Sequence, residues 1–248
     1  MCDLQNPAST GGHPDRRTFL KRATVATAAG LLGARLGRHV AYADALTREQ
    51  RDKMTPDEII SLMKKGNERF RAGERADRNF LREQQASAKG QYPAAVVLSC
   101  IDSRAPAEVI MDLGIGDIFN ARVAGNIANQ DILGSMEFAC QVAGAKVVLV
   151  MGHTACGAIK GAIDRAQLGN LTNLLARIHP AVEATRYDGE RSSKNNTFVN
   201  AVARKNVELT MTNIRQQSSV LQNLESNGAI KIVGAMYDLD TALLEFLA

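Results

Sequence analysis

The sequence predicts an α/β protein with a single domain, in which helices flank a mainly parallel central sheet and an N-terminal helical arm precedes it. Three observations support this class. From residue 94 onward, short and almost continuously apolar segments alternate with helical segments, as expected for strands buried between two layers of helices. Before residue 90 the apolar spacing is helical. Residues 44–248 are enough for one domain with a sizeable core.

Residues 1–43 are predicted to be a twin-arginine signal peptide. Arg16 and Arg17 precede a mildly apolar run over residues 23–36, and Ala-Tyr-Ala at residues 41–43 fits the small-x-small pattern that signal peptidases accept. The run is too short and weakly apolar for a membrane span, which needs about 20 residues. The alternative is an amphipathic surface helix or a retained anchor. We therefore expect twin-arginine export in a bacterium, to the periplasm or beyond, without a stable membrane anchor.

The predicted mature domain, residues 44–248, has no net formal charge. Residues 1–43 contain six Lys and Arg but two acidic residues, so 24 residues of each sign remain. This balance gives no positive face for nucleic acid, and no nucleic-acid partner is expected. Three cysteines remain, Cys100, Cys140 and Cys156. An odd number in an exported protein argues against a disulfide framework and favours metal binding or catalysis.

The N-terminal arm is predicted over residues 55–89, where Pro56 suits a first helical turn. Four strands are predicted from short apolar runs, at residues 94–99, 117–123, 146–151 and 230–236. Helices are predicted between and after them, at residues 105–111, 131–143, 156–168, 171–184 and 198–217. This alternation predicts a mainly parallel sheet.

Two segments complete the expected domain. Residues 189–196 are the most polar part of the mature chain and are predicted to be a solvated loop. Residues 241–247 are apolar and fit either a short helix or an edge strand. The sequence leaves this choice open.

Candidate metal ligands follow two of the predicted strands. Cys100 comes directly after residues 94–99, and His153 follows residues 146–151 after one glycine. Parallel strands end at the same edge of a sheet, where open α/β folds collect their ligands. Cys156 stands three residues beyond His153, at a predicted helix start, so one helical turn is expected to align the two side chains. The free amides at a helix start favour the thiolate form of a cysteine.

These three residue types suit a catalytic zinc ion. Two thiolates and one imidazole are donors that Zn²⁺ prefers, and three protein ligands leave a fourth tetrahedral position for water or substrate. Bound zinc lowers the pKa of water from 15.7 to about 7, which supplies a hydroxide nucleophile. Cys140 differs, because it lies in the apolar part of a predicted helix and is expected to be a packed core thiol.

A carboxylate and a guanidinium follow the first ligand, in the segment Cys100-Ile101-Asp102-Ser103-Arg104. A carboxylate beside a cation stays ionised, so Asp102 paired with Arg104 can accept a hydrogen bond from a zinc-bound hydroxide. Alternatively, Asp102 can turn away from Arg104 and take the fourth zinc position, which closes the site. The spacing does not distinguish these two geometries.

Together these motifs resemble the β-class carbonic anhydrases, whose marks are a Cys-x-Asp-Ser-Arg segment and a later His-x-x-Cys. The resemblance runs over residues 91–160 without a break. It implies zinc-dependent, reversible hydration of carbon dioxide to bicarbonate and a proton by a zinc-bound hydroxide, with one zinc per chain. The resemblance also implies Cys100, His153 and Cys156 as zinc ligands, and Asp102 with Arg104 as the catalytic dyad.

The resemblance implies a substrate pocket near the zinc. By position, Gln91 is expected as a hydrogen-bond donor, Phe119 and Phe138 as an apolar wall, and Gly157 as a nearby backbone amide. Many relatives have a hydroxyl-bearing aromatic in place of Phe138, which puts any role for that hydroxyl in question here. The family builds its pocket across a dimer interface wrapped by N-terminal helices. A homodimer or homotetramer is therefore expected.

Two other functions fit the same residues. One is an enzyme on the same scaffold that hydrolyses carbon disulfide or carbonyl sulfide through a narrowed entrance. The other is a non-catalytic zinc protein that binds or senses bicarbonate, or whose zinc is purely structural. The presence of both Asp102 and Arg104 weighs against the second function, since a purely structural zinc site has no use for an adjacent ion pair.

Overall fold

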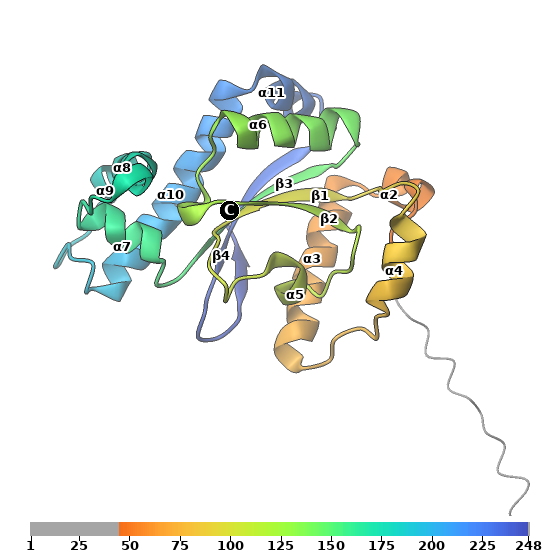
Figure 1. The fold of residues 1–248 in the computed structure, drawn as a ribbon, viewed down its shortest axis with the longest axis horizontal. Helices are drawn as coiled ribbons and strands as arrows, with labels where there is room; N and C mark the ends of the chain where they lie inside the picture. The colour runs from red at the N-terminus through yellow and green to blue at the C-terminus, as the bar shows by residue number, and fades with distance from the viewer. Residues whose placement is uncertain (1–44, 248) are drawn as a thin grey trace, which may run out of the picture. The chain divides into compact units, whose positions relative to one another are not determined.

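The computed structural model describes residues 45–247, so the predicted signal peptide lies outside the described residues. The described chain forms one sheet with helices on both faces (Figure 1). The sheet has five strands in the order β2-β1-β3-β4-β5. This arrangement confirms the predicted class, an α/β domain with a mainly parallel central sheet. Among these residues, no helix combines the length and apolar character needed to span a membrane.

Four of the strands are parallel neighbours, and the last is antiparallel. The strands are β1 (Ala95–Ser99), β2 (Ile118–Arg122), β3 (Val147–His153), β4 (Lys231–Tyr237) and β5 (Leu244–Phe246). The four predicted strands are found within two residues of their expected bounds. The C-terminal apolar segment is an edge strand, paired with β4, and not a helix.

The N-terminal arm consists of α3 (Pro56–Ala72) and α4 (Phe80–Ser87), preceded by the short helix α2 (Arg48–Lys53). Thr55 and Glu58 form a reciprocal capping box at the start of α3, and Gly73 ends it in a left-handed conformation. Helix α2 was not predicted, because it is polar throughout and has no apolar periodicity.

Seven further helices follow the arm. They are α5 (Ala107–Ile110), α6 (Gln130–Glu137), α7 (Gly157–Ile163), α8 (Gly169–Ala176), α9 (His179–Ala184), α10 (Asn196–Gln217) and α11 (Ser219–Ser226). Two short helical turns, η1 (Ala124–Asn126) and η2 (Phe138–Val142), complete the set. The second of these is a π-helical turn that continues α6.

The structure corrects two helix predictions. The single helix expected over residues 171–184 is two helices, α8 and α9, because Pro180 cannot donate the backbone hydrogen bond that would continue α8 and instead stands in the first turn of α9. Helix α11 was not expected. Ser218 ends α10 and its side chain caps the start of α11 by accepting a hydrogen bond from the amide of Leu221.

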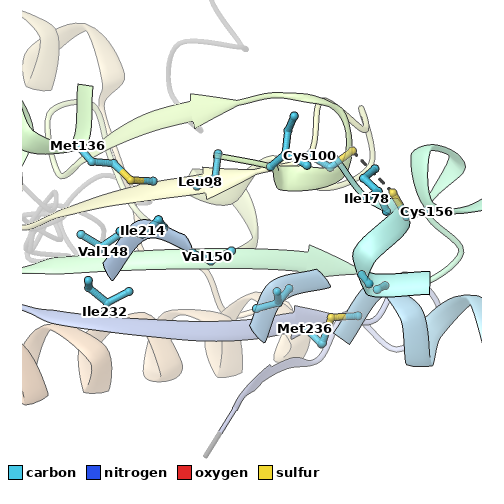
Figure 2. Close-up of a cluster of buried hydrophobic side chains, with 14 of the residues drawn as sticks. Leu98, Cys100, Met136, Val148, Val150, Cys156, Ile178, Ile214, Ile232 and Met236 are labelled. Atoms are coloured by element: carbon cyan, nitrogen blue, oxygen red, sulfur yellow. Dashed lines mark hydrogen bonds between the residues drawn. The ribbon is translucent and has the colours of Figure 1, made fainter. Parts of the chain in front are cut away.

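The core has two layers because alternate strand residues face opposite sides of the sheet. Leu98, Val148 and Val150 pack with α6, α10 and α11, a cluster that Figure 2 shows in close-up. Val97 and Leu149 pack with α3 and α5 on the other face. Burial of each such side chain contributes roughly 1.5–3 kcal/mol relative to exposure.

Helix α10 packs over two strand positions that have no side chain. A Cβ atom on Gly152 of β3 would lie 2.7 Å from Val207, and one on Gly234 of β4 would also lie 2.7 Å from Val207. A larger residue at either position would require Val207 or the helix to move. This contact fixes α10 beside the carboxyl ends of β3 and β4.

Candidate metal centre

Three buried side chains converge at the carboxyl edge of the sheet. Cys100 directly follows β1, His153 is the last residue of β3, and Cys156 immediately precedes α7. Strands β1 and β3 are in register there, with Ser99 beside Met151. The two Sγ atoms and a ring nitrogen of His153 all lie within 4.8 Å of one another. Figure 2 shows the two cysteines facing each other at one end of the buried cluster, with their sulfur atoms 4.0 Å apart.

The His153 ring presents a lone pair to this group. Its Nδ1 lies 2.9 Å from the carbonyl oxygen of Thr154, and since a carbonyl can only accept, Nδ1 carries the proton in this contact. The other ring nitrogen, Nε2, is buried and has no hydrogen-bond partner among the described residues. A buried, unpaired polar atom costs free energy, whereas a cation at this position would satisfy it. The donor set therefore fits a metal ion.

The turn between His153 and Cys156 differs from the expected helical turn. Ala155 has a left-handed backbone, with φ of 52°, and Cys156 is extended, with φ of −65° and ψ of 124°. The two side chains therefore converge through a tight turn before the helix. Two hydrogen bonds hold Thr154 to the end of β4 and the segment that follows it. The amide of Thr154 donates to the carbonyl of Tyr237 at 3.0 Å, and its Oγ1 accepts from the amide of Leu239 at 2.9 Å.

The two thiols have opposite pKa shifts. A hydrogen bond from Cys156 outweighs burial and lowers the pKa of Cys100 to about 4. The neighbouring Cys100 sulfur and burial raise the pKa of Cys156, although the amides of Ala158 and Ile159 oppose the shift. The pair thus shares one proton, because two adjacent thiolates in a buried site repel each other. A cation that contacts both sulfurs removes this obstacle and allows both to ionise.

Asp102 is held by Arg104 and faces the same group. Its Oδ1 accepts from the amide and Nε of Arg104 at 2.9 and 3.0 Å, and its Oδ2 accepts from Nη2 at 2.8 Å. The Arg104 hydrogen bond outweighs desolvation and lowers the pKa of Asp102, so this carboxylate is ionised at neutral pH. Its Oδ2 lies 3.8 Å from Nε2 of His153. Of the two geometries left open by the spacing, this structure has the one in which Asp102 pairs with Arg104.

Arg122 and Gly125 also belong to the site, although the sequence analysis assigned them no role there. Arg122 donates from Nε to the carbonyl of Cys100 at 2.9 Å and from Nη2 to that of Asp102 at 2.6 Å. The amide of Gly125 donates to Sγ of Cys100 at 3.4 Å. Both residues reach the site because β2 pairs with β1, and the spacing of residues along the sequence does not reveal this pairing.

The expected substrate-pocket residues lie in three places, and only Gly157 is next to a candidate ligand. Gly157 is the exposed first residue of α7, next to Cys156. Phe119 and Phe138 contact each other edge to face, with ring centroids 6.2 Å apart, and line an open cavity of about 630 Å³. None of the three ligand-type residues lines that cavity in the described part of the chain. Gln91 is exposed and precedes β1, whose opposite end leads to Cys100.

Cys140 is separate from this group. Its thiol is buried in η2, where burial raises its pKa to about 12. It is therefore a neutral, packed thiol at physiological pH, as expected from its apolar surroundings.

Comparisons with known proteins agree on one family. The family model described as "Carbonic anhydrase" matches residues 95–244. Carbonic anhydrase 2 of Mycobacterium tuberculosis is 34% identical over 184 residues, which cover 72% of this chain and 86% of that protein. The carbonic anhydrase of Mycolicibacterium smegmatis is 32% identical over 189 residues, which cover 74% and 89%. A solved β-carbonic anhydrase of the fungus Aspergillus fumigatus, 27% identical, has a TM-score of 0.57 and covers 66% of this chain and 79% of its own.

Proposed function

The chain belongs to the β-class carbonic anhydrase family, and from this premise we propose that Cys100, His153 and Cys156 hold one Zn²⁺ ion per chain for the reversible hydration of carbon dioxide to bicarbonate and a proton. One observation carries the assignment of residues. The three buried ligand atoms lie within 4.8 Å of one another, beside an ionised carboxylate that is not one of them. A purely structural zinc site has four protein ligands and needs no such neighbour.

The chemistry of the donors favours zinc. Two sulfurs and an imidazole nitrogen are ligands that Zn²⁺ prefers, whereas Mg²⁺ and Ca²⁺ prefer oxygen ligands. When bound, Zn²⁺ supplies the Lewis acidity that brings the pKa of a water molecule close to neutral pH. The protein supplies Nε2 of His153 as a neutral donor because Nδ1 carries its proton toward the carbonyl of Thr154.

Asp102 is proposed to orient the reacting water. An ionised carboxylate only accepts hydrogen bonds, so Oδ2 of Asp102, which faces the ligand group, fixes the direction of a water O–H and leaves the oxygen lone pair free for the carbon of carbon dioxide. Arg104 holds that carboxylate with three hydrogen bonds and keeps it ionised. Its side chain is 59% exposed, so its own charge is hydrated and its main effect is on Asp102.

The proposed pocket requires a second copy of the chain. Phe119 and Phe138 line a cavity without the metal group, and Phe138 is 52% exposed. Family resemblance suggests that a homodimer or homotetramer brings this apolar wall and Gln91 of one chain to the metal group of another. Sedimentation velocity measures the mass directly, and a protein that remains monomeric at micromolar concentration and hydrates carbon dioxide at full rate would contradict this arrangement.

We also propose export by the twin-arginine route, to the periplasm or beyond, with cleavage after Ala43. Arg16, Arg17 and the small residues at 41–43 support this proposal. Replacing both arginines by lysine should retain the protein in the cytoplasm of a producing bacterium. N-terminal sequencing of the exported protein should begin at Asp44, and an unprocessed N-terminus would contradict the proposal.

The central experiment compares two cysteine variants. We expect the wild type to contain about one zinc per chain and to hydrate carbon dioxide in stopped-flow assays. Cys156→Ser should lose most of its zinc, and its rate of carbon dioxide hydration should fall at least about 10³-fold, because the Lewis-acid contribution is worth several kcal/mol. Cys140→Ala removes a buried thiol outside the group and should keep both properties. A metal-free wild type that is folded and active, or a fully active Cys156→Ser, would overturn the assignment. Sulfide release from carbon disulfide, without hydration, would indicate the alternative substrate.

A further inference from the structure

Helix α10 contacts the turn that leads from His153 to Cys156 and the loop that lies beside Cys100. Asn200 accepts a hydrogen bond at Oδ1 from the amide of Ala155 at 2.9 Å, and Asn206 donates from Nδ2 to the carbonyl of Gly125 at 2.8 Å. Both backbone partners are left-handed, with φ of 52° at Ala155 and 70° at Gly125. We infer that Asn200 and Asn206 are positioning residues, which hold the two loops in the conformation that the metal site needs. This inference rests on the proposed metal site.

Asn200 acts on the turn between His153 and Cys156. A left-handed alanine is strained, since its Cβ crowds the backbone, and such strain persists only where surrounding contacts impose it. The hydrogen bond from Ala155 to Asn200 is a contact of this kind. If Ala155 relaxes to a right-handed or extended backbone, the chain leaves His153 in another direction and the Cys156 sulfur moves away from the other two ligands.

Asn206 acts on the loop beside Cys100. The peptide of Gly125 is fixed on both sides, since its carbonyl accepts from Asn206 and its amide donates to Sγ of Cys100 at 3.4 Å. A Cβ atom at Gly125 would lie 2.5 Å from Cδ1 of Ile178, so the loop also has no room for a side chain. Asn206 is 3% exposed, which makes its amide a buried polar group with a defined partner.

The helix itself is a suitable support for both contacts. Its 22 residues form the longest helix in the described chain. Val207 of α10 packs over Gly152 and Gly234, and so places the helix against β3, the strand that ends in His153. The same helix therefore contacts both loops and the sheet. This arrangement positions the ligands before a metal binds.

The two hydrogen bonds have opposite polarity, and this gives a test with matched variants. A backbone amide can only donate, so Asn200 must present its oxygen, and a carbonyl can only accept, so Asn206 must present its nitrogen. Asn200→Asp keeps an acceptor and should retain Zn²⁺ affinity within a few-fold. Asn206→Asp has the same shape but loses the donor. It should bind Zn²⁺ about 10- to 100-fold more weakly, the usual cost of removing a supporting partner.

Zn²⁺ affinity is measured by competition with a chromophoric chelator, and the d–d absorption of the Co²⁺-substituted protein reports the ligand geometry. Asn200→Ala should weaken Zn²⁺ binding about 10- to 100-fold and alter the Co²⁺ spectrum. Asn213→Ala, an exposed change on the same helix, should leave both unchanged. Thermal unfolding of the metal-free proteins separates these effects from a general loss of stability.

Changes at Ala155 test the same inference without altering α10. Glycine adopts the left-handed backbone freely, so Ala155→Gly should reduce the effect of Asn200→Ala on Zn²⁺ affinity to a few-fold. Ala155→Val, whose branched side chain disfavours that backbone, should weaken binding even with Asn200 present, and it provides the test if Asn200→Ala does not fold. The inference fails if the wild type binds Zn²⁺ and all these variants bind it equally well. A wild type that binds no Zn²⁺ instead contradicts the proposed function.

Discussion

Two buried polar groups in this protein have opposite chemistry. The metal group at the carboxyl edge of the sheet contains lone-pair donors alone, Cys100, His153 and Cys156. The second group, here called the charge cluster, lies between the N-terminal arm and the segment before β2 and contains three basic and three acidic residues. Its members are Arg69, Arg75, Arg78, Glu83, Asp112 and Asp117.

The charges of the cluster compensate one another, whereas the donors of the metal group do not. Asp112 has no exposed side-chain surface and accepts from Arg69 Nε at 2.6 Å, and the buried Glu83 accepts from Arg78 Nη1 at 3.2 Å. Removing one partner of a buried ion pair is destabilising, because it leaves an uncompensated buried charge. The two sulfurs and the ring nitrogen of the metal group have no cationic side chain among them, and a bound cation would supply the missing positive charge. Complementary buried charges thus indicate a structural role, and converging like donors indicate a ligand.

The comparison extends to the backbone, because each group contains a left-handed residue other than glycine. Asp112 has φ of 48° and Ala155 has φ of 52°. Asp is among the residues that tolerate this conformation, and its own carboxylate accepts from the amide of Ala76. Alanine has no such compensation of its own. The strain at Ala155 is imposed from outside, which is typical of functional turns.

The largest effect is expected in the metal group. Asp102→Asn should lower the rate of carbon dioxide hydration about 10²- to 10⁴-fold, because an amide presents an N–H donor where an acceptor is needed. Zinc content and thermal stability should stay close to those of the wild type. Asp57→Asn, which removes an exposed carboxylate paired with Lys231, is the matched control in the stopped-flow assay. An unchanged rate in Asp102→Asn would remove the role assigned to this residue.

A smaller effect, on stability and not on metal binding, is expected in the charge cluster. Asp112→Asn keeps a residue that tolerates the left-handed backbone but removes the charge that Arg69 and Arg75 face. We expect the free energy of unfolding to fall by about 2–3 kcal/mol, less than for a fully enclosed pair because both arginines reach solvent. Arg75→Ala should cost at most about 1 kcal/mol. Urea unfolding measures both, and an equal loss of Zn²⁺ affinity would erase the distinction between the two groups.

The smallest effect we predict is a difference in acid sensitivity. As the pH falls, the metal group should lose zinc before the charge cluster loses its contribution to stability. Burial alone raises the pKa of Asp112, but the hydrogen bonds from Arg69 and the amide of Ala76 outweigh it and lower this pKa below the ordinary value of 3.8. A lowered pKa contributes stability that is complete above 3.8 and is lost as the pH falls below it. Zinc should leave at higher pH, because protons compete for the cysteine and histidine ligands.

Two measurements over the same pH range check this order. Zinc content after desalting should decrease before the far-ultraviolet signal of folded protein does. In the metal-free protein, the urea midpoint of the wild type should exceed that of Asp112→Asn above about pH 4, and the difference should shrink below it. Coincident loss of zinc and fold at every pH would argue against two independent groups.

The sequence was sufficient for the fold class and for the elements with strong apolar patterns. Strands β1 and β3 are continuous buried runs, and both lie close to their predicted bounds. Prediction failed where short-range capping decides the structure. The polar helix α2 depends on Thr47 and Gln50, and the break before α11 depends on the side chain of Ser218. A hydrophobic period does not record such hydrogen bonds.

For the site, residue types and order in the chain identified the candidate ligands, but their supports were invisible. Arg122 lies 22 residues from Cys100 in sequence, and Asn200 lies 45 residues from Ala155. Their contacts arise from the pairing of β2 with β1 and from the packing of α10 on the sheet. The left-handed turn at Ala155 was also unforeseen, since alanine carries no local signal for that conformation. The choice between the two Asp102 geometries likewise required coordinates.

The close packing at Gly152 has a consequence for engineering. A methyl group on Gly152, the residue immediately before a candidate ligand, would overlap Val207, and the same valine also obstructs Gly234. Libraries that randomise the strand around His153 should therefore return mostly misfolded proteins. Variation at Asn200 and Asn206 keeps the strands and the ligands, and should change metal affinity through the two loops that these residues contact.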